Sequence, residues 1–215
     1  MQDIIDSLKK LKKDDFYENV NLHIHTSLSD GILSPLEVVE EAKKINLKLI
    51  SITDHNSIEA YKLMDFEDFD GLKIIAGVEF DCWHKSTLLH ILGYGFNIND
   101  KKLTEICSKN SNGTKLDFVR FFNKRKAKDV INIIKEAGGI AVLAHPACCW
   151  SLNIKKMIKK LQLFGLDGLE LYYPYKGHRG MIKFYSVKKI KELALELNLL
   201  ITGGTDCHGR SLRDR

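Results

Sequence analysis

Val20-Asn21-Leu22-His23-Ile24-His25 joins a short apolar run to two histidines that lie two residues apart. Residues two apart in a β-strand point to the same face, so we expect both imidazoles to project one way and Leu22 and Ile24 the other. Two histidines on one face at the end of a strand form a chelate for a divalent metal ion. Surface histidines are common, however, so this pair alone does not establish a site.

The same pattern recurs at or near the ends of five later apolar runs. It comprises Asp54-His55 after residues 49–52, Glu79 after 74–78, His90 within 88–92, His145 after 140–144, and Asp206 with His208 after 199–201. Six of the eight histidines therefore accompany expected strands. Chance clustering of this kind is hard to sustain, and the pattern predicts one shared metal site.

Short apolar runs alternate with amphipathic stretches along most of the chain, which predicts an α/β fold of parallel strands with helices outside. About seven such units are too many for a small three-layer sheet in 215 residues, so we expect a closed or nearly closed barrel. In a parallel barrel all strand C-termini lie on one face, where active sites are found. The expected strands are 20–24, 47–52, 72–78, 88–92, 140–144, 168–171 and 199–202.

Several helices are well signalled. Ser34-Pro35-Leu36-Glu37 predicts a capping box with proline at the first helical position, and Asn56-Ser57-Ile58-Glu59 repeats that logic. A helix over 124–137 should end at Gly138-Gly139. Helical spacing also links Ile154, Met157, Ile158 and Leu161, and a second set of Ile182, Tyr185, Leu193, Ala194 and Leu197.

Length and composition are those of an ordinary globular protein, and we expect one domain over 1–215, with an N-terminal helix in 1–18 and a polar excursion near the site over 97–123. No apolar stretch approaches a membrane span, and acids near the start argue against a signal peptide, so we expect a cytoplasmic location without a membrane partner. Five cysteines, an odd number, are expected to be reduced thiols. The net charge of +5 and the basic stretch 101–128 fit either a solvated surface or an anionic substrate.

Imidazoles and carboxylates without a thiolate set suit zinc, manganese or iron. The candidate ligands outnumber what one ion needs, so two or three divalent ions are expected, with a carboxylate such as Glu79 bridging a pair.

Taken in order, these residues resemble the PHP (polymerase and histidinol phosphatase) family over roughly 19–209, closest to its small phosphoesterases acting on nucleotides or short oligonucleotides. The resemblance implies a distorted (β/α)7 TIM-like barrel with a trinuclear site at the C-terminal ends of the strands. The span between His90 and His145 is shorter than in larger relatives of the family. The matching stretches are His23-x-His25, Ser29-Asp30-Gly31, Thr53-Asp54-His55-Asn56, Gly77-Val78-Glu79, His90-Ile91-Leu92-Gly93-Tyr94, Ala144-His145-Pro146, Gly168 to Pro174, and Thr205-Asp206-x-His208-Gly209.

The resemblance also implies ligand sets. The first ion would be held by His23, His25, Glu79 and Asp206, the second by Glu79, His90 and His145, and the third by Asp30, His55 and His208.

Other candidates come with two interpretations each. Asp54 could orient an imidazole or be a hydrogen-bonded loop residue, and His178 could protonate a leaving oxygen or lie on a plain surface loop. Tyr172 and Tyr173 could stack on a base or pack at the barrel edge. Four basic residues could bind the phosphate of a substrate, or each could simply be a charged side chain in solvent: Arg179, Arg125, Lys124 and Arg210.

The expected function is hydrolysis of phosphomonoesters by a metal-activated hydroxide at a trinuclear site. The substrate would be a small anionic phosphorylated molecule such as a nucleotide or short oligonucleotide. Two alternatives stay open: an amidohydrolase-type enzyme cleaving C–N bonds, and a non-catalytic accessory module.

Overall fold

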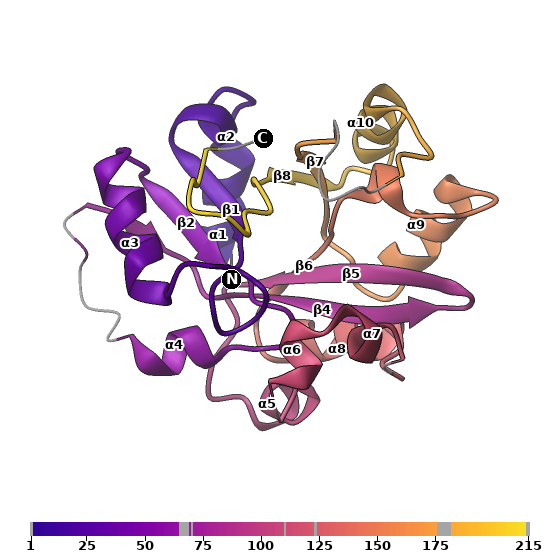
Figure 1. The fold of residues 1–215 in the computed structure, drawn as a ribbon. Helices are drawn as coiled ribbons and strands as arrows, with labels where there is room; N and C mark the ends of the chain where they lie inside the picture. The colour runs from indigo at the N-terminus through magenta and orange to yellow at the C-terminus, as the bar shows by residue number, and fades with distance from the viewer. Residues whose placement is uncertain are drawn as a thin grey trace.

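The computed structural model describes residues 2–64, 69, 71–109, 111–122, 124–175 and 182–213, and shows a mixed α/β fold (Figure 1). The strands are β1 (Val20–Ile24), β2 (Leu49–Ile52), β3 (Lys73–Ile74), β4 (Gly77–His84), β5 (Thr87–Tyr94), β6 (Ile140–Leu143), β7 (Gly168–Tyr172) and β8 (Leu200–Gly203). The helices are α1 (Gln2–Lys10), α2 (Asp15–Glu18), α3 (Pro35–Lys44), α4 (Glu59–Leu63), α5 (Lys101–Ile106), α6 (Asn112–Lys115), α7 (Asp117–Phe121), α8 (Ala127–Glu136), α9 (Ile154–Gln162) and α10 (Val187–Glu196), with a 3-10 turn η1 (Pro146–Cys148).

The strands form two sheets rather than one continuous barrel of paired strands. One has the order β1-β2-β3 and the other β4-β5-β6-β7-β8. Isolated bridges join them at both sides: Ile24 pairs with Cys207 just beyond β8, and His55 just beyond β2 pairs with Glu79 in β4. These junctions bring the ends of β1, β2 and β8 beside the start of β4.

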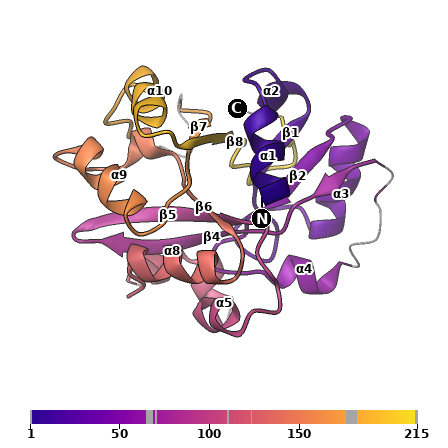
Figure 2. The same ribbon diagram turned by 180° about the vertical axis from the view of Figure 1, so that it is seen from behind.

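The expectation of seven parallel units is wrong at β4 and β5, which form an antiparallel hairpin. Residues 79–84 continue the strand that we expected to end at Val78, and a two-residue turn at Lys85 and Ser86 reverses the chain. Side chains alternate along β4: Phe80 and Cys82 are fully buried on the core face, which packs against α8, so Glu79 and Asp81 share the opposite face. Figure 2 shows α8 running beneath the hairpin.

Two other corrections follow from local hydrogen bonding. Asn56 does not cap α4; its side chain binds Asp81, and Ile58 takes the cap position. Residues 2–18 contain two helices instead of one, and between them the backbone N–H of Lys12 donates to Asp15 Oδ2 at 2.7 Å.

Helices α3 and α9 follow the sequence patterns closely, whereas α8 begins at Ala127, three residues after the expected start at 124. Ser34 and Glu37 form the complete capping box of α3, and α8 is followed by Gly138 with φ +84°. The apolar spacing of α9 is confirmed, since Ile154, Met157, Ile158 and Leu161 are all buried. Helix α10 begins only at Val187, so Ile182 and Tyr185, which we expected within it, precede its first turn.

The segment 97–123 carries α5, α6 and α7. Its contacts reach the loop after β1, where Thr114 Oγ1 donates to the Leu28 carbonyl at 3.0 Å. Its last part is apolar rather than polar, with Leu116, Phe118, Val119, Phe121 and Phe122 exposed. No helix among the described residues is long and apolar enough to cross a membrane.

Candidate metal centre

Six imidazole rings gather where the strands of both sheets meet. His25 lies at the centre, with ring centroids 4.1 Å from His208, 4.6 Å from His55 and 5.1 Å from His23. His90 and His145 extend the chain of contacts at 5.3 Å from His55 and 5.0 Å from His90, respectively. The fold therefore unites all six histidines that the sequence pattern singled out.

The best-defined group contains His23, His25, Glu79 and Asp206, all buried. The two Nε2 atoms are 3.1 Å apart, and each lies 3.2 Å from Glu79 Oε2. Asp206 Oδ1 lies 3.3 Å from His23 Nε2 and 3.0 Å from His25 Nε2. A tetrahedral zinc ion with ligands at about 2.0–2.2 Å would set its ligand atoms about 3.3–3.6 Å apart, so this donor set fits a small dication.

Glu79 faces two groups with its two oxygens. Oε2 meets His23 and His25, whereas Oε1 lies 3.1 Å from His90 Nδ1 and 3.4 Å from His145 Nε2. The two oxygens of one carboxylate thus face two separate pairs of imidazoles. His55 also belongs beside this second group, with Nδ1 3.4 Å from Glu79 Oε2.

A third group forms around Asp30, on the loop after β1. Its Oδ1 lies 3.1 Å from His208 Nε2 and 3.6 Å from His25 Nδ1, and its Oδ2 lies 3.9 Å from His55 Nε2. Arg120 of α7 also reaches this carboxylate, with Nη1 3.1 Å from Oδ2.

The buried carboxylates of the cluster make it an environment that favours cations. Burial raises the pKa of Glu79, but His23, His55 and His90 outweigh it and hold the pKa well below its usual range. Burial lowers the pKa of His25 and His90, yet the neighbouring carboxylates raise these values to about 9 and about 10. Burial lowers the pKa of His55 to about 3. In the metal-free protein, protonated imidazoles therefore balance the negative charge of the buried carboxylates. A bound divalent ion would balance the same negative charge.

Several residues support this cluster without belonging to the predicted ligand sets. Glu170 Oε1 is 2.9 Å from His23 Nδ1, which assigns the proton to Nδ1 and leaves Nε2 facing the group. Tyr173 donates to Asp206 Oδ2 at 2.8 Å, which leaves Oδ1 for the histidines. His145 and Asp206 both have positive φ, of 31° and 52°, a backbone conformation that is strained outside glycine.

Asp54 forms hydrogen bonds with the loop after β1, and with no imidazole of the described residues, contrary to one of our two interpretations. Its carboxylate accepts from Thr26 N at 2.7 Å, Thr26 Oγ1 at 2.6 Å and Ser29 Oγ at 2.5 Å. Ser29 Oγ in turn lies 3.5 Å from His25 Nδ1. Asp54 therefore orders the loop that carries Asp30, and any role in catalysis stays a prediction.

The phosphate candidates are dispersed. Arg125 donates from Nε to the Ile106 carbonyl at 2.8 Å, and Lys124 and Arg210 are exposed. His178 and Arg179 lie outside the described residues, so their roles stay predictions.

Sequence reasoning missed Asp81, Glu170 and Arg120. Asp81 Oδ1 lies 3.1 Å from His90 Nε2. The alternation of side chains along β4 places Asp81 on the same face as Glu79. We did not predict this because we expected the strand to end at Val78. Glu170 was visible as a lone acid within an apolar run. Arg120 had no such signal, because it lies in a short helix among phenylalanines.

The sequence profile of the PHP domain matches residues 21–199. This chain belongs to the PHP domain family. The mixed α/β fold agrees with that assignment.

Relatives within the family are distant in sequence. A phosphoribosyl 1,2-cyclic phosphate 1,2-diphosphodiesterase from Eggerthella lenta is 21% identical, over 88% of this chain and 94% of its own. A 5'-3' exoribonuclease from Haemophilus influenzae is 23% identical, over 70% of this chain and 78% of its own. A solved structure from Bifidobacterium adolescentis, described as a candidate metal-dependent phosphoesterase, has a TM-score of 0.71 at 19% identity and covers 90% of this chain and 88% of its own.

Proposed function

We propose that this PHP protein hydrolyses phosphomonoesters, with nucleotides and short oligonucleotides as its substrates. The coarser class, a metal-dependent hydrolase acting on phosphate esters, follows from the family and from relatives that are named a phosphodiesterase and an exoribonuclease. The position of Glu79 carries the proposal, since its two oxygens face two separate sets of imidazoles.

The proposed ligand sets are those that the resemblance implied. His23, His25, Glu79 and Asp206 would hold one ion, Glu79, His90 and His145 a second, and Asp30, His55 and His208 a third, with zinc, manganese or iron as the metal. The distorted (β/α)7 barrel belongs to the same proposal, supported by the bridges that join the two sheets at both sides.

Bound divalent ions would supply an acidified water and would offset negative charge on the phosphoryl oxygens. The residues of this chain prepare the site for both. Glu170 and Tyr173 hold the His23 ring and the Asp206 carboxylate in fixed orientations. Glu79, Asp30, Asp81 and Asp206 would repel a phosphate dianion on their own, so phosphate binding here requires the added positive charge.

A metal-reconstituted screen tests the proposal. The protein is stripped of metal, loaded in turn with zinc, manganese or iron, and assayed with nucleotides, sugar phosphates, short oligonucleotides, p-nitrophenyl phosphate and a cyclic amide. Release of phosphate from monoesters is expected. Turnover of the amide alone would favour the amidohydrolase alternative, and no hydrolysis across the panel would favour the accessory module.

Glu79→Ala provides the matching loss-of-function test. It should abolish turnover and lower the number of bound ions per chain, because it removes the shared ligand. Glu59→Ala, at an exposed position on α4, serves as the control and should change neither. Retained activity in Glu79→Ala would contradict the bridging role.

A further inference from the structure

The face of the β4–β5 hairpin that carries the metal centre continues outward beyond it. Asp81 pairs with His90, and the next pair on the same face, toward the hairpin tip, is Trp83 with Leu88. A cavity of about 550 Å³ lies over this part of the hairpin and is lined by Asp81, Leu88 and His90. It therefore opens directly beside a proposed metal ligand.

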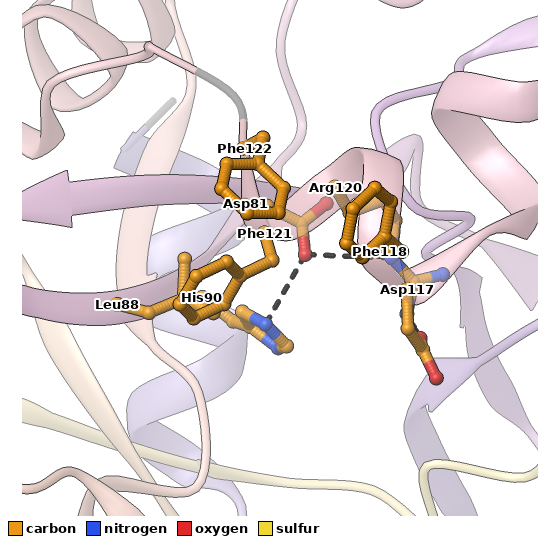
Figure 3. Close-up of a pocket in the computed structure, with 8 residues that line it drawn as sticks. All are labelled: Asp81, Leu88, His90, Asp117, Phe118, Arg120, Phe121 and Phe122. Atoms are coloured by element: carbon orange, nitrogen blue, oxygen red, sulfur yellow. Dashed lines mark hydrogen bonds and ion pairs between the residues drawn. The ribbon is translucent and has the colours of Figure 1, made fainter.

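Helix α7 and Phe122 directly after it supply the opposite wall of this cavity with three phenylalanines. Phe118 and Phe122 are 74% and 62% exposed, and Phe121 is about half exposed. Their rings touch one another, at centroid distances of 4.8 Å for Phe118–Phe122 and 5.3 Å for Phe121–Phe122. Figure 3 shows these rings around the cavity with Asp81 and His90 beside them.

The aromatic wall is anchored to the metal centre. Between the phenylalanines, the buried Arg120 forms ion pairs with Asp30 and Asp81, at 3.1 and 3.6 Å. Trp83 Nε1 donates to the Phe121 carbonyl at 3.2 Å, and its ring stands edge-on to that of Phe121 at 5.1 Å. These contacts fix the position of the phenylalanine rings relative to His90.

The tyrosines that the sequence offered for stacking are used elsewhere. The Tyr173 ring is buried and its hydroxyl binds Asp206, while Tyr172 packs against Phe16 at 5.2 Å. Exposed aromatic surface beside the centre is instead found on α7.

We propose that this cavity binds the nucleobase of a mononucleotide whose phosphate lies at the metal centre. The inference rests on the proposed function and specifies its substrate class. A flat heterocycle matches a wall of exposed rings, because base–aromatic stacking is favourable for any base. The cavity volume lies within the range of small-ligand sites. Its continuity with Asp81 and His90 allows one molecule to occupy both places.

A binding experiment without metal separates this inference from catalysis. The chain has two tryptophans, so Trp150→Phe leaves Trp83 as the single reporter beside the cavity. Adenosine and ribose, which carry no phosphate for the metal-free carboxylates to repel, are titrated into this protein in the presence of a chelator, and Trp83 emission is recorded. Adenosine should change the emission saturably and bind more tightly than ribose.

Phe118→Ala, made in the same background, should weaken the binding of adenosine roughly 10-fold, because one stacking partner is lost. Phe118→Trp should retain it. Leu195→Ala removes a similarly exposed apolar side chain from α10 and should have no effect. Equal affinities for the two ligands, or no change in Phe118→Ala, would overturn the proposal.

Kinetics of the metal-loaded protein give the second measurement. Phe118→Ala and Phe122→Ala should each lower kcat/KM for adenosine monophosphate roughly 10-fold and leave ribose 5-phosphate within about twofold. Hydrolysis of both substrates without this discrimination would refute the base site and leave the phosphoesterase function standing. Binding that depends on Phe118 without any hydrolysis would support the base site and contradict the phosphoesterase function.

Discussion

At the scale of single residues, Glu170 shows how the centre depends on groups outside the proposed ligand sets. Its carboxylate is fully buried and accepts from His23 Nδ1 and from the backbone N–H of His145, each at 2.9 Å. One side chain thereby orients residues from two proposed ion sites. Outer carboxylates of this kind typically contribute 10–100-fold to metal affinity.

Glu170→Gln is therefore expected to lower metal affinity by about 10–100-fold while keeping the size of the side chain. Competition with a chelating indicator measures the change. Glu192→Gln, at an exposed position on α10, is the control for loss of one acid. Unchanged affinity in Glu170→Gln would mean that the His23 ring is oriented by packing alone.

At the scale of elements, the junction of β1 with the end of β8 decides where Asp206 lies. A Cβ atom added at Gly204 would lie 2.3 Å from His23 Cβ and 2.4 Å from the His23 backbone nitrogen. The absence of a side chain at Gly204 thus allows the two segments to approach closely. This close approach brings Asp206 beside His23, 183 positions earlier in the chain, so that both can belong to one proposed ligand set.

Gly204→Ala should separate β8 from β1, with a loss of about 1–3 kcal/mol in the free energy of unfolding from overpacking. Metal affinity should fall as well, because Asp206 moves with the strand end. Chemical denaturation and metal titration measure the two effects. Gly209→Ala is the matched control, since a Cβ there meets nothing within 4 Å, and equal behaviour of the two variants would contradict the close-packing argument.

At the scale of the whole molecule, carboxylates and imidazoles from both ends of the chain meet in one buried cluster. The pKa values of His25 and His90, about 9 and about 10, lie above the ordinary value of 6.5. At pH 7 these values favour the positively charged imidazolium form of both rings in the metal-free protein. Histidine must be neutral to bind a metal, so metal binding and proton release are linked.

Metal binding at pH 7 should release protons, and the apparent affinity should rise with pH and level off only above about 10, the higher of the two pKa values. Calorimetry in two buffers of different ionisation enthalpy gives the number of protons released. His90→Asn should lower that number by about one, whereas His84→Asn, at a ring that packs near Phe164, should not. A metal-binding enthalpy independent of the buffer would refute the linkage.

The sequence by itself determined which imidazoles and carboxylates gather in one cluster, and where most of the strands lie. The apolar runs that end in His25, His55 and His145 predicted strands leading to one site, because alternation and burial are local properties of the chain. The capping box at Ser34 and the apolar stripe of α9 were equally local. Asp30 came from the family resemblance, since nothing in its own loop marked it.

Only the tertiary structure decided which face of the β4–β5 hairpin is buried, and with it the placement of Asp81, and also the contacts of Arg120. The buried face is the one that α8 covers, which is a contact between distant segments, whereas the reversal between β4 and β5 is a local two-residue turn at Lys85 and Ser86. Arg120 reaches Asp30 across 90 residues of chain, and that proximity leaves no periodic trace in the sequence. The candidate metal ligands are visible in the local pattern of the sequence. The charges and aromatic rings that surround them come together only when distant segments of the chain pack against one another.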